Sequence, residues 1–312
     1  MRNSLRIVIQ SRDRPEYLKE AIDSVLNQRQ ENVDIKLLVS DNSIGDEVGS
    51  MVNAFYSDED FDYVRRDPPL NSAVNHTKLI ISECEEDYVV LFHDDDVLRP
   101  NYVEIMFPFI QNQGVAAVGC NTYIFKNDLA KHLKAKPHKF NKPKQFISEK
   151  EFLMQYIPNS YGVAVYPGYM YKLKCLKKIN QVNNYRKNGG NDILILNSLL
   201  TYGSIVWIPD YLVYYRLHDS NDGNNLYTVD HILILNSMAR NGIDKHTTAA
   251  SMRFNYMLQW FIAQDIKNIF SWRNRTVLKY LFFKSFYLMS RIDLWKSLVN
   301  NRYVKNKILQ RR

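Results

Sequence analysis

The first forty residues constrain the fold most, because two short apolar runs flank one amphipathic segment. Residues 5–9 read LRIVI and residues 35–40 read IKLLVS, and both have the length and branched apolar content of a buried strand. Between these runs, Pro15 begins a segment whose apolar residues recur at the three- and four-residue spacing of a helix. A strand, a helix and a second strand in this order favour a right-handed βαβ unit and a parallel sheet.

The alternation of strands and helices continues beyond this unit. Further apolar runs predict strands at residues 61–64, 87–92, 115–119 and 204–209. Ser148 and Glu151 form a capping box, which predicts the start of another helix. The sequence therefore predicts an α/β fold with a Rossmann-like, mostly parallel central sheet flanked by helices. We expect this domain to span residues 1–227, with a helical extension over residues 228–312.

The positive charge of the chain is concentrated in that extension. Residues 251–312 contain thirteen Lys or Arg and two acidic residues, so they carry +11, and the net charge of +8 leaves −3 for the remainder. They also contain thirteen aromatic residues. This composition suits a helix at the surface of an anionic membrane, or a helical bundle that packs on the α/β domain or on a second copy of the chain. The sequence leaves both alternatives open.

Two further observations concern partners and location. No zinc-finger, homeodomain or RNA-binding motif accompanies the basic residues, so we expect no nucleic-acid partner. The apolar run near the amino terminus is too short for the core of a signal peptide, and the longest apolar piece of the extension, residues 277–289, is too short to span a bilayer. We therefore expect a cytoplasmic protein, with peripheral contact at the inner face of the plasma membrane as the membrane-bound alternative.

Three consecutive aspartates, Asp94, Asp95 and Asp96, follow the predicted strand at residues 87–92. In doubly wound sheets, ligands bind at the carboxyl ends of the strands. Adjacent carboxylates repel one another, and a cation relieves that repulsion. Mg²⁺ and Mn²⁺ accept carboxylate oxygens and commonly share them with substrate phosphates. The triplet therefore points to a divalent metal and a phosphorylated ligand, with a solvated acidic turn as the alternative.

Five segments, in order, carry a resemblance to the family 2 glycosyltransferases of the GT-A fold. They are VIQSRDRPEYLKEAIDSVLNQ, LLVSDNS, FHDDDVLRP, GGND and YYRLH, and the resemblance covers about residues 5 to 220. It implies an inverting transfer of a sugar from a nucleotide diphosphate donor, with UDP as the expected nucleotide and Mn²⁺ or Mg²⁺ as the metal. It also implies that residues 1–120 form the nucleotide-binding half of the domain and residues 121–227 the acceptor-binding half.

The resemblance implies a role for each matching residue. Asp192 corresponds to the base that removes the proton of the acceptor hydroxyl. The metal ligands are expected to be Asp95, Asp94 and His218, and an imidazole suits Mn²⁺ better than Mg²⁺. The residues expected to bind the donor are Ser11, Arg14, Asp41, Asn75, Asp94 and Arg216. Asp41 is expected to accept hydrogen bonds from the nucleobase, with Ser11 and Arg14 in the same pocket, and Arg216 is expected to contact the diphosphate oxygens.

This chain departs from the family pattern at three positions. His93 stands where the motif has its first aspartate, Asn191 replaces a glutamate beside Asp192, and Ser40 replaces the first aspartate of the second-strand element. Asp192 would also serve as a helix cap. A non-catalytic nucleotide- or glycan-binding module is therefore an alternative. A nucleotidyltransferase is another, although the segment QSRDRPEY lacks the glycines of a phosphate-binding loop.

The acceptor also follows only from the resemblance. Bacterial relatives typically build capsule, O-antigen or wall polymers, which implies a saccharide or lipid-linked saccharide acceptor. A homo-oligomer formed through the C-terminal helices is a further expectation.

Overall fold

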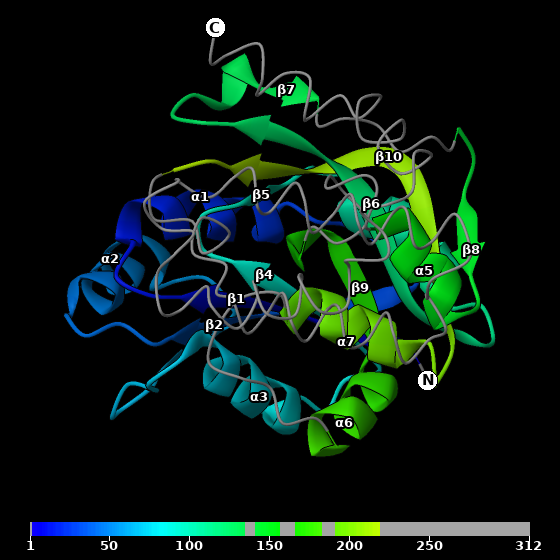
Figure 1. Ribbon diagram of the computed structural model, residues 1–312. Coiled ribbons are helices and arrows are strands. Elements are labelled where there is room, and N and C mark those ends of the chain that lie inside the picture. The colour runs from blue at the N-terminus through cyan, green and yellow to red at the C-terminus, as the bar shows by residue number, and fades with distance from the viewer. Residues whose placement is uncertain (1, 135–140, 157–165, 183–190, 219–312) are drawn as a thin grey trace, which may run out of the picture. The chain divides into compact units, whose positions relative to one another are not determined.

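The computed structural model describes residues 2–134, 141–156, 166–182 and 191–218 (Figure 1). The chain divides into one compact unit of residues 1–148 and 161–224 and a second of residues 149–160 and 225–312. Of the second unit, only helix α5 (Glu149–Tyr156) is described, and it begins directly after Ser148 of the predicted capping box. The predicted helical extension, residues 228–312, lies outside the described residues.

The strands described in the first unit belong to one sheet, in the order β3-β2-β1-β4-β9-β6-β10-β5. Its strands are β1 (Asn3–Ser11), β2 (Val33–Asp41), β3 (Asp62–Arg65), β4 (Tyr88–His93), β5 (Val97–Leu98), β6 (Val115–Phe125), β9 (Tyr169–Lys172) and β10 (Ser204–Arg216). Two short strands lie off this path, where β7 (Leu133–Lys134) pairs with β6 and β8 (Lys144–Phe146) pairs with β10.

The sheet is parallel in one part and mixed in the other. β1 pairs in parallel with β2 and β4, and β2 pairs in parallel with β3, which confirms the predicted βαβ arrangement. β9 is inserted between β4 and β6 and runs antiparallel to both. The α/β class is thus confirmed, with a mixed sheet in place of a mostly parallel one.

β10 is one strand of thirteen residues where the sequence indicated a shorter strand ending at Pro209. Its pairing with β6 is irregular between Trp207 and Tyr211. A proline cannot donate to a sheet ladder, and such irregularities are the places where strands tolerate it. The strand therefore continues past Pro209 and ends at Arg216.

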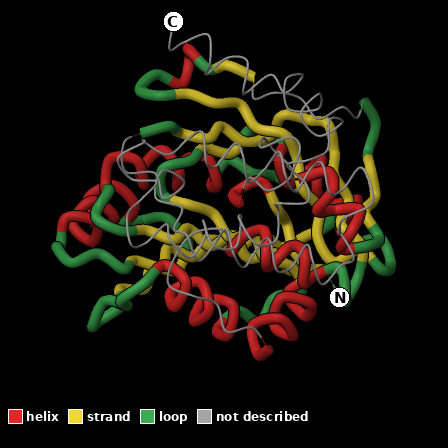
Figure 2. The backbone as a smooth tube through the Cα atoms, viewed as in Figure 1, coloured by secondary structure: helices red, strands yellow, loops and turns green. Residues whose placement is uncertain are grey.

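Helices cover both faces of the sheet (Figure 2). They are α1 (Pro15–Leu26), α2 (Glu47–Tyr56), α3 (Ala73–Glu83), α4 (Tyr102–Ile110), α6 (Leu173–Val182) and α7 (Asn191–Leu199), with short turns η1 (Leu129–Lys131) and η2 (Tyr166–Gly168). The apolar sides of α1, α2 and α4 share one core cluster with the sheet, while α3 and α6 lie together below it in Figure 1. None of the described helices is long and apolar enough to cross a membrane.

The apolar run of β1 is buried on both faces, as its composition indicated. Ile7 and Ile9 join the core under α1 and α2, while Val8 is buried on the opposite face. The register pairs Ser11 with Asp41 and Gln10 with His93. The carboxyl ends of β1, β2 and β4 therefore lie side by side, and the polar residues that follow them meet at one edge.

Candidate functional site

The three aspartates form a buried turn between β4 and β5. Asp94, Asp95 and Asp96 are 3%, 5% and 0% exposed, respectively. Buried carboxylates are costly unless they are paired or hydrogen-bonded, so their partners define what the turn can do. These partners come from the loop after β1 and from the end of β10.

The loop after β1 supplies two contacts to the turn. The main-chain N–H of Arg12 donates to Asp94 Oδ2 at 2.8 Å. One guanidinium nitrogen of Arg14, Nη1, lies 3.1 Å from Asp94 Oδ1 and 2.8 Å from Asp95 Oδ2. Asp13 adopts a left-handed conformation with φ of 56°, which aspartate tolerates, and its Oδ1 accepts from the main-chain N–H of Ile44. The loop is thereby fixed to the segment that follows β2, while Arg14 faces the carboxylates.

The end of β10 supplies the other contacts. His218 Nε2 lies 2.7 Å from Asp95 Oδ2, the same oxygen that Arg14 approaches. The main-chain N–H of Arg216 donates to Asp96 Oδ1, and its Nε donates to the main-chain oxygen of Asp95, both at 2.9 Å. The structure thus brings together Arg14, Asp94, Asp95, Arg216 and His218, five of the residues that the sequence had singled out.

The surroundings shift the pKa values of the three carboxyl groups in different directions. Burial raises the pKa of Asp94 to about 7, against the effect of the Arg14 cation. Burial and the charge of Asp95 raise the pKa of Asp96 well above its usual range. Burial also acts to raise the pKa of Asp95, but the imidazoles of His93 and His218 and the Arg14 cation together outweigh it and lower that pKa. Asp95 therefore ionises most readily of the three.

The residues of this turn fit a divalent cation. Ligand atoms of His93, Asp95 and Asp96 all lie within 4.8 Å of one another. Asp96 Oδ2 is buried and has no hydrogen-bond partner among the described residues; His93 Nδ1 lies 3.8 Å from it. Carboxylate oxygens together with imidazole nitrogens suit Mn²⁺. Sequence reasoning gave His93 no role, and its place one residue before the triplet was the signal that could have suggested one.

Three further residues expected to bind the donor, Asp41, Ser11 and Asn75, differ in exposure. Asp41 is fully buried; its Oδ1 accepts from the main-chain N–H of Ser43 and its Oδ2 from the hydroxyl of Tyr63. Ser11 is buried at the end of β1. Asn75 is exposed on α3, where its side-chain amide donates to Asn71.

Ser40, which replaces a family aspartate, belongs to a buried polar network. Its hydroxyl lies 2.7 Å from His76 Nε2 and accepts from Arg66 Nε at 2.9 Å. Arg66 in turn forms two hydrogen bonds with the carboxylate of Glu83. Burial and the charge of Arg66 lower the pKa of His76 to about 4. This network ties β2 to α3 directly beneath Asp41.

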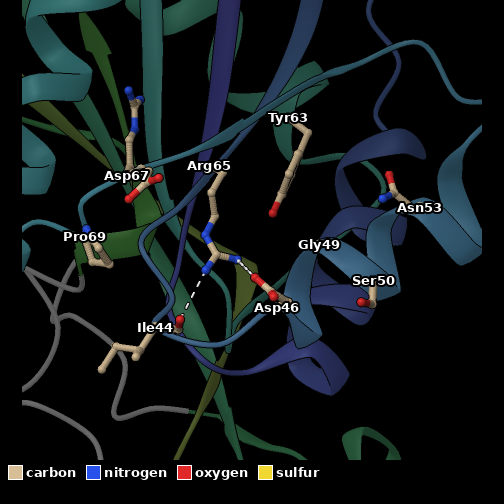
Figure 3. Close-up of a pocket in the computed structure, with 10 residues that line it drawn as sticks. Ile44, Asp46, Gly49, Ser50, Asn53, Tyr63, Arg65, Asp67 and Pro69 are labelled. Atoms are coloured by element: carbon tan, nitrogen blue, oxygen red, sulfur yellow. Dashed lines mark hydrogen bonds and ion pairs between the residues drawn. The ribbon is translucent and has the colours of Figure 1, made fainter.

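A pocket of about 490 Å³ opens beside α2 and the end of β3 (Figure 3). Arg65 crosses it, with Nη1 3.3 Å from Asp46 Oδ1 and 3.6 Å from Asp41 Oδ2. Tyr63, whose hydroxyl holds Asp41, lines the same pocket. Two residues that contact Asp41 thus line this pocket, whereas Asp94, Asp95 and Asp96 are not among its lining residues.

Asp192, the expected base, lies in the first turn of α7. Its side chain is outside the described residues. Its assignment as the base therefore stays a prediction.

Comparison with known proteins gives one family match and several related proteins. The family model described as glycosyl transferase family 2 matches residues 6–179. Abequosyltransferase RfbV of Salmonella typhimurium is 28% identical over 102 residues, which are 32% of this chain and 31% of RfbV. The chain therefore matches about a third of the length of this relative.

Solved structures share the fold at low sequence identity. TarS residues 1–349 of S. aureus, in complex with UDP-GlcNAc, aligns over 96% of this chain and 79% of its own, with a TM-score of 0.60 and 12% identity. The mannosyltransferase PcManGT of Pyrobaculum calidifontis, in complex with GDP-Man and Mn²⁺, aligns over 99% and 87%, with a TM-score of 0.53 and 10% identity. At these identities the likeness shows the fold alone.

Proposed function

The chain belongs to glycosyl transferase family 2, and on that premise we propose that it transfers a sugar from a nucleotide diphosphate donor to a saccharide acceptor, with inversion and with the help of a divalent cation. The observation that carries this proposal is the position of the Asp95 carboxylate. It lies at the carboxyl end of β4, next to the ends of β1 and β2, with Arg14 and His218 directed at one oxygen.

The donor is proposed to lie across this edge of the sheet. Asp41 and Ser11 would face the base and ribose, with Asn75 at the rim, and Asp94 would contact the ribose or the metal. We propose UDP as the nucleotide, because a solved structure of this fold contains UDP-GlcNAc, while GDP remains the competitor because another contains GDP-Man.

The metal would be held by Asp95, Asp94 and His218, the residues implied by the resemblance. The cluster of His93, Asp95 and Asp96 offers a second ligand set that shares Asp95. When bound, a divalent cation stabilises the negative charge of the leaving diphosphate. Arg14 already forms an ion pair with both carboxylates, and its guanidinium matches phosphate oxygens as well as carboxylates. We propose that Arg14 turns toward the diphosphate when the donor binds.

Asp192 is proposed as the base. The acceptor hydroxyl attacks the anomeric carbon from the face opposite the diphosphate, its oxygen forms the new bond as the bond to the leaving oxygen breaks, and Asp192 takes the proton. Attack from the opposite face inverts the anomeric centre. The acceptor is proposed to be a saccharide or lipid-linked saccharide of a surface polysaccharide, made on the cytoplasmic side of the membrane.

A thermal-shift screen of nucleotides and nucleotide sugars, with and without Mn²⁺, tests the donor. A bound ligand stabilises the folded protein by mass action, so UDP-sugars with Mn²⁺ are expected to raise Tm most. A larger rise in Tm with GDP-sugars would change the proposed nucleotide from UDP to GDP, while the proposed sugar transfer would stand. If no nucleotide raises Tm in the presence of the metal, the proposal is wrong.

Nucleotide release then separates a transferase from a protein that only binds the donor. The alternative of a binding module rests on His93 and Asn191, which depart from the family pattern. A transferase releases UDP from the bound UDP-sugar. The release is slow when the sugar is transferred to water and faster when a saccharide acceptor is present. If UDP-sugar binds but no UDP is released with any acceptor tested, the result would favour a non-catalytic binding module.

A further inference from the structure

Arg216 is almost entirely inside the protein, although the sequence suggested that it contacts diphosphate. It is 3% exposed. Its main-chain N–H holds Asp96 Oδ1, and its Nε holds the main-chain oxygen of Asp95. Arg216 therefore holds the acidic turn at two points, the side chain of Asp96 and the backbone of Asp95.

Helix α1 holds Arg216 in this position. Glu20 Oε1 lies 3.0 Å from Nη2 of Arg216, and the guanidinium carbon lies 4.3 Å from the centre of the Tyr17 ring. Phe125 covers the guanidinium as well, at 4.4 Å. A buried guanidinium needs a negative partner and gains from contact with aromatic rings. The ion pair with Glu20 supplies a negative partner for this guanidinium.

The same face of α1 also contacts His218. Tyr17 and Glu20 are three residues apart, which places them on one side of a helix. The rings of Tyr17 and His218 are centred 5.8 Å apart. Arg216 and His218 are two residues apart, and the main-chain N–H of Leu217 between them donates to the main-chain oxygen of Phe125 at 2.8 Å. The chain at the end of β10 is thereby held between β6 and α1.

We propose that Glu20 and Tyr17 are positioning residues that act through Arg216 to set the place of the acidic turn and of His218, and thereby the affinity for the divalent cation. This inference rests on the proposed function. It gives Arg216 a role inside the protein, in place of the diphosphate contact expected from the sequence. It also extends the site to α1, whose residues would never touch the metal or the donor.

The binding of Mn²⁺ to the full chain, followed by electron paramagnetic resonance of the free ion, tests this inference. Glu20→Gln removes the charge that holds the guanidinium and keeps the side-chain size. We expect it to weaken Mn²⁺ binding about 10- to 100-fold, the range found when a residue that orients a metal ligand is lost. Glu16→Gln is the matched control, because Glu16 is an exposed acid of the same helix. An affinity of Glu20→Gln within twofold of wild type would overturn the proposal.

Two further variants separate positioning from a general loss of structure. Tyr17→Phe keeps the ring and is expected to bind Mn²⁺ like wild type, whereas Tyr17→Leu is expected to bind it more weakly. In a double-mutant cycle, adding Arg216→Lys to Glu20→Gln should weaken binding by less than the two separate effects combined, because both act through one contact. Independent effects would contradict action through Arg216.

A diphosphate contact by Arg216 gives a different pattern. Arg216→Lys would then weaken UDP binding more than UMP binding and leave Mn²⁺ binding without nucleotide unchanged, and this result would overturn the inference. Asp95→Ala serves as the reference for the proposed function. If it binds Mn²⁺ like wild type, the metal site itself is misplaced; if it loses Mn²⁺ while Glu20→Gln does not, only the positioning role fails.

Discussion

The imidazole of His218 reaches the carboxylate of Asp95 across 123 positions of sequence, with Nε2 2.7 Å from Oδ2. The end of β10 and the turn after β4 thus meet at one oxygen. If this oxygen and the imidazole both bind Mn²⁺, replacing the imidazole removes one ligand and leaves the turn in place.

His218→Gln is therefore expected to weaken Mn²⁺ binding by at least about tenfold while the protein stays folded. Isothermal titration of Mn²⁺ in the presence of UDP measures the change. His132→Gln is a matched control, since the contacts described for that imidazole are with the rings of Tyr123 and Tyr214 and the main-chain oxygen of Leu129, not with the three aspartates. Equal affinity in His218→Gln and wild type would remove His218 from the ligand set.

Acid is expected to destabilise the fold through His76. Its pKa is lowered from 6.5 to about 4 in the folded state, chiefly by burial, so between these values the unfolded chain binds a proton that the folded chain does not. Stability is thus complete above about pH 6.5 and falls as pH decreases towards 4. The loss amounts to about 2 kcal/mol between pH 7 and pH 5.

Urea denaturation at these two pH values, compared between wild type and His76→Gln, checks this contribution. The variant lacks the titrating group, so its free energy of unfolding should change less with pH than that of wild type. An identical pH dependence would show that His76 is not the group responsible.

The sequence could predict the edge of the site because parallel strands align their carboxyl ends. Ser11, Asp41 and Asp94 each follow an apolar run, and the register of β1 with its neighbours brings them together. Their partners were harder to predict. An amphipathic pattern marks the buried side of α1 but says nothing of which strand end lies beside Tyr17 and Glu20. The ion pair of Glu20 with Arg216 depends on where β10 ends in the folded sheet, and the local sequence around either residue does not encode that position.

The mixed part of the sheet was beyond prediction for a similar reason. β9 enters between β4 and β6 although it begins 44 positions after the end of β6, and a run of four strand residues carries no sign of its direction. The core around it is tightly packed. Gly119 on β6 faces Tyr169 and Trp207, and a Cβ added there would lie 2.5 Å from the first ring and 2.7 Å from the second.

Gly119→Ala should therefore destabilise the fold, because both rings are fully buried and neither can move without disturbing the core. Overpacking of this kind typically costs about 1–3 kcal/mol. The midpoint of urea denaturation measures the loss. Gly168→Ala is the control, since a Cβ there would make only ordinary contacts at 3.5 Å with Cys120. Equal stability of the two variants would contradict this packing.

Membrane association is expected to depend on the basic C-terminal region. Residues 251–312 carry +11, so the full chain should sediment with vesicles that contain anionic lipid, and salt should release it. A chain ending at residue 250 should remain in the supernatant. Equal sedimentation of both chains, or none with the full chain, would favour packing of this region on protein.

The release of UDP from UDP-sugars with Mn²⁺ and acceptor present, compared between wild type and Asp192→Asn, tests the central claim most directly. A glycosyltransferase whose base is Asp192 is expected to release UDP, and the variant should lose that activity about 100-fold or more while still binding UDP with Mn²⁺. Asp34→Asn, at an exposed position of β2, should behave like wild type. Unchanged turnover in Asp192→Asn, or no turnover by wild type with any nucleotide sugar that binds, would contradict the account.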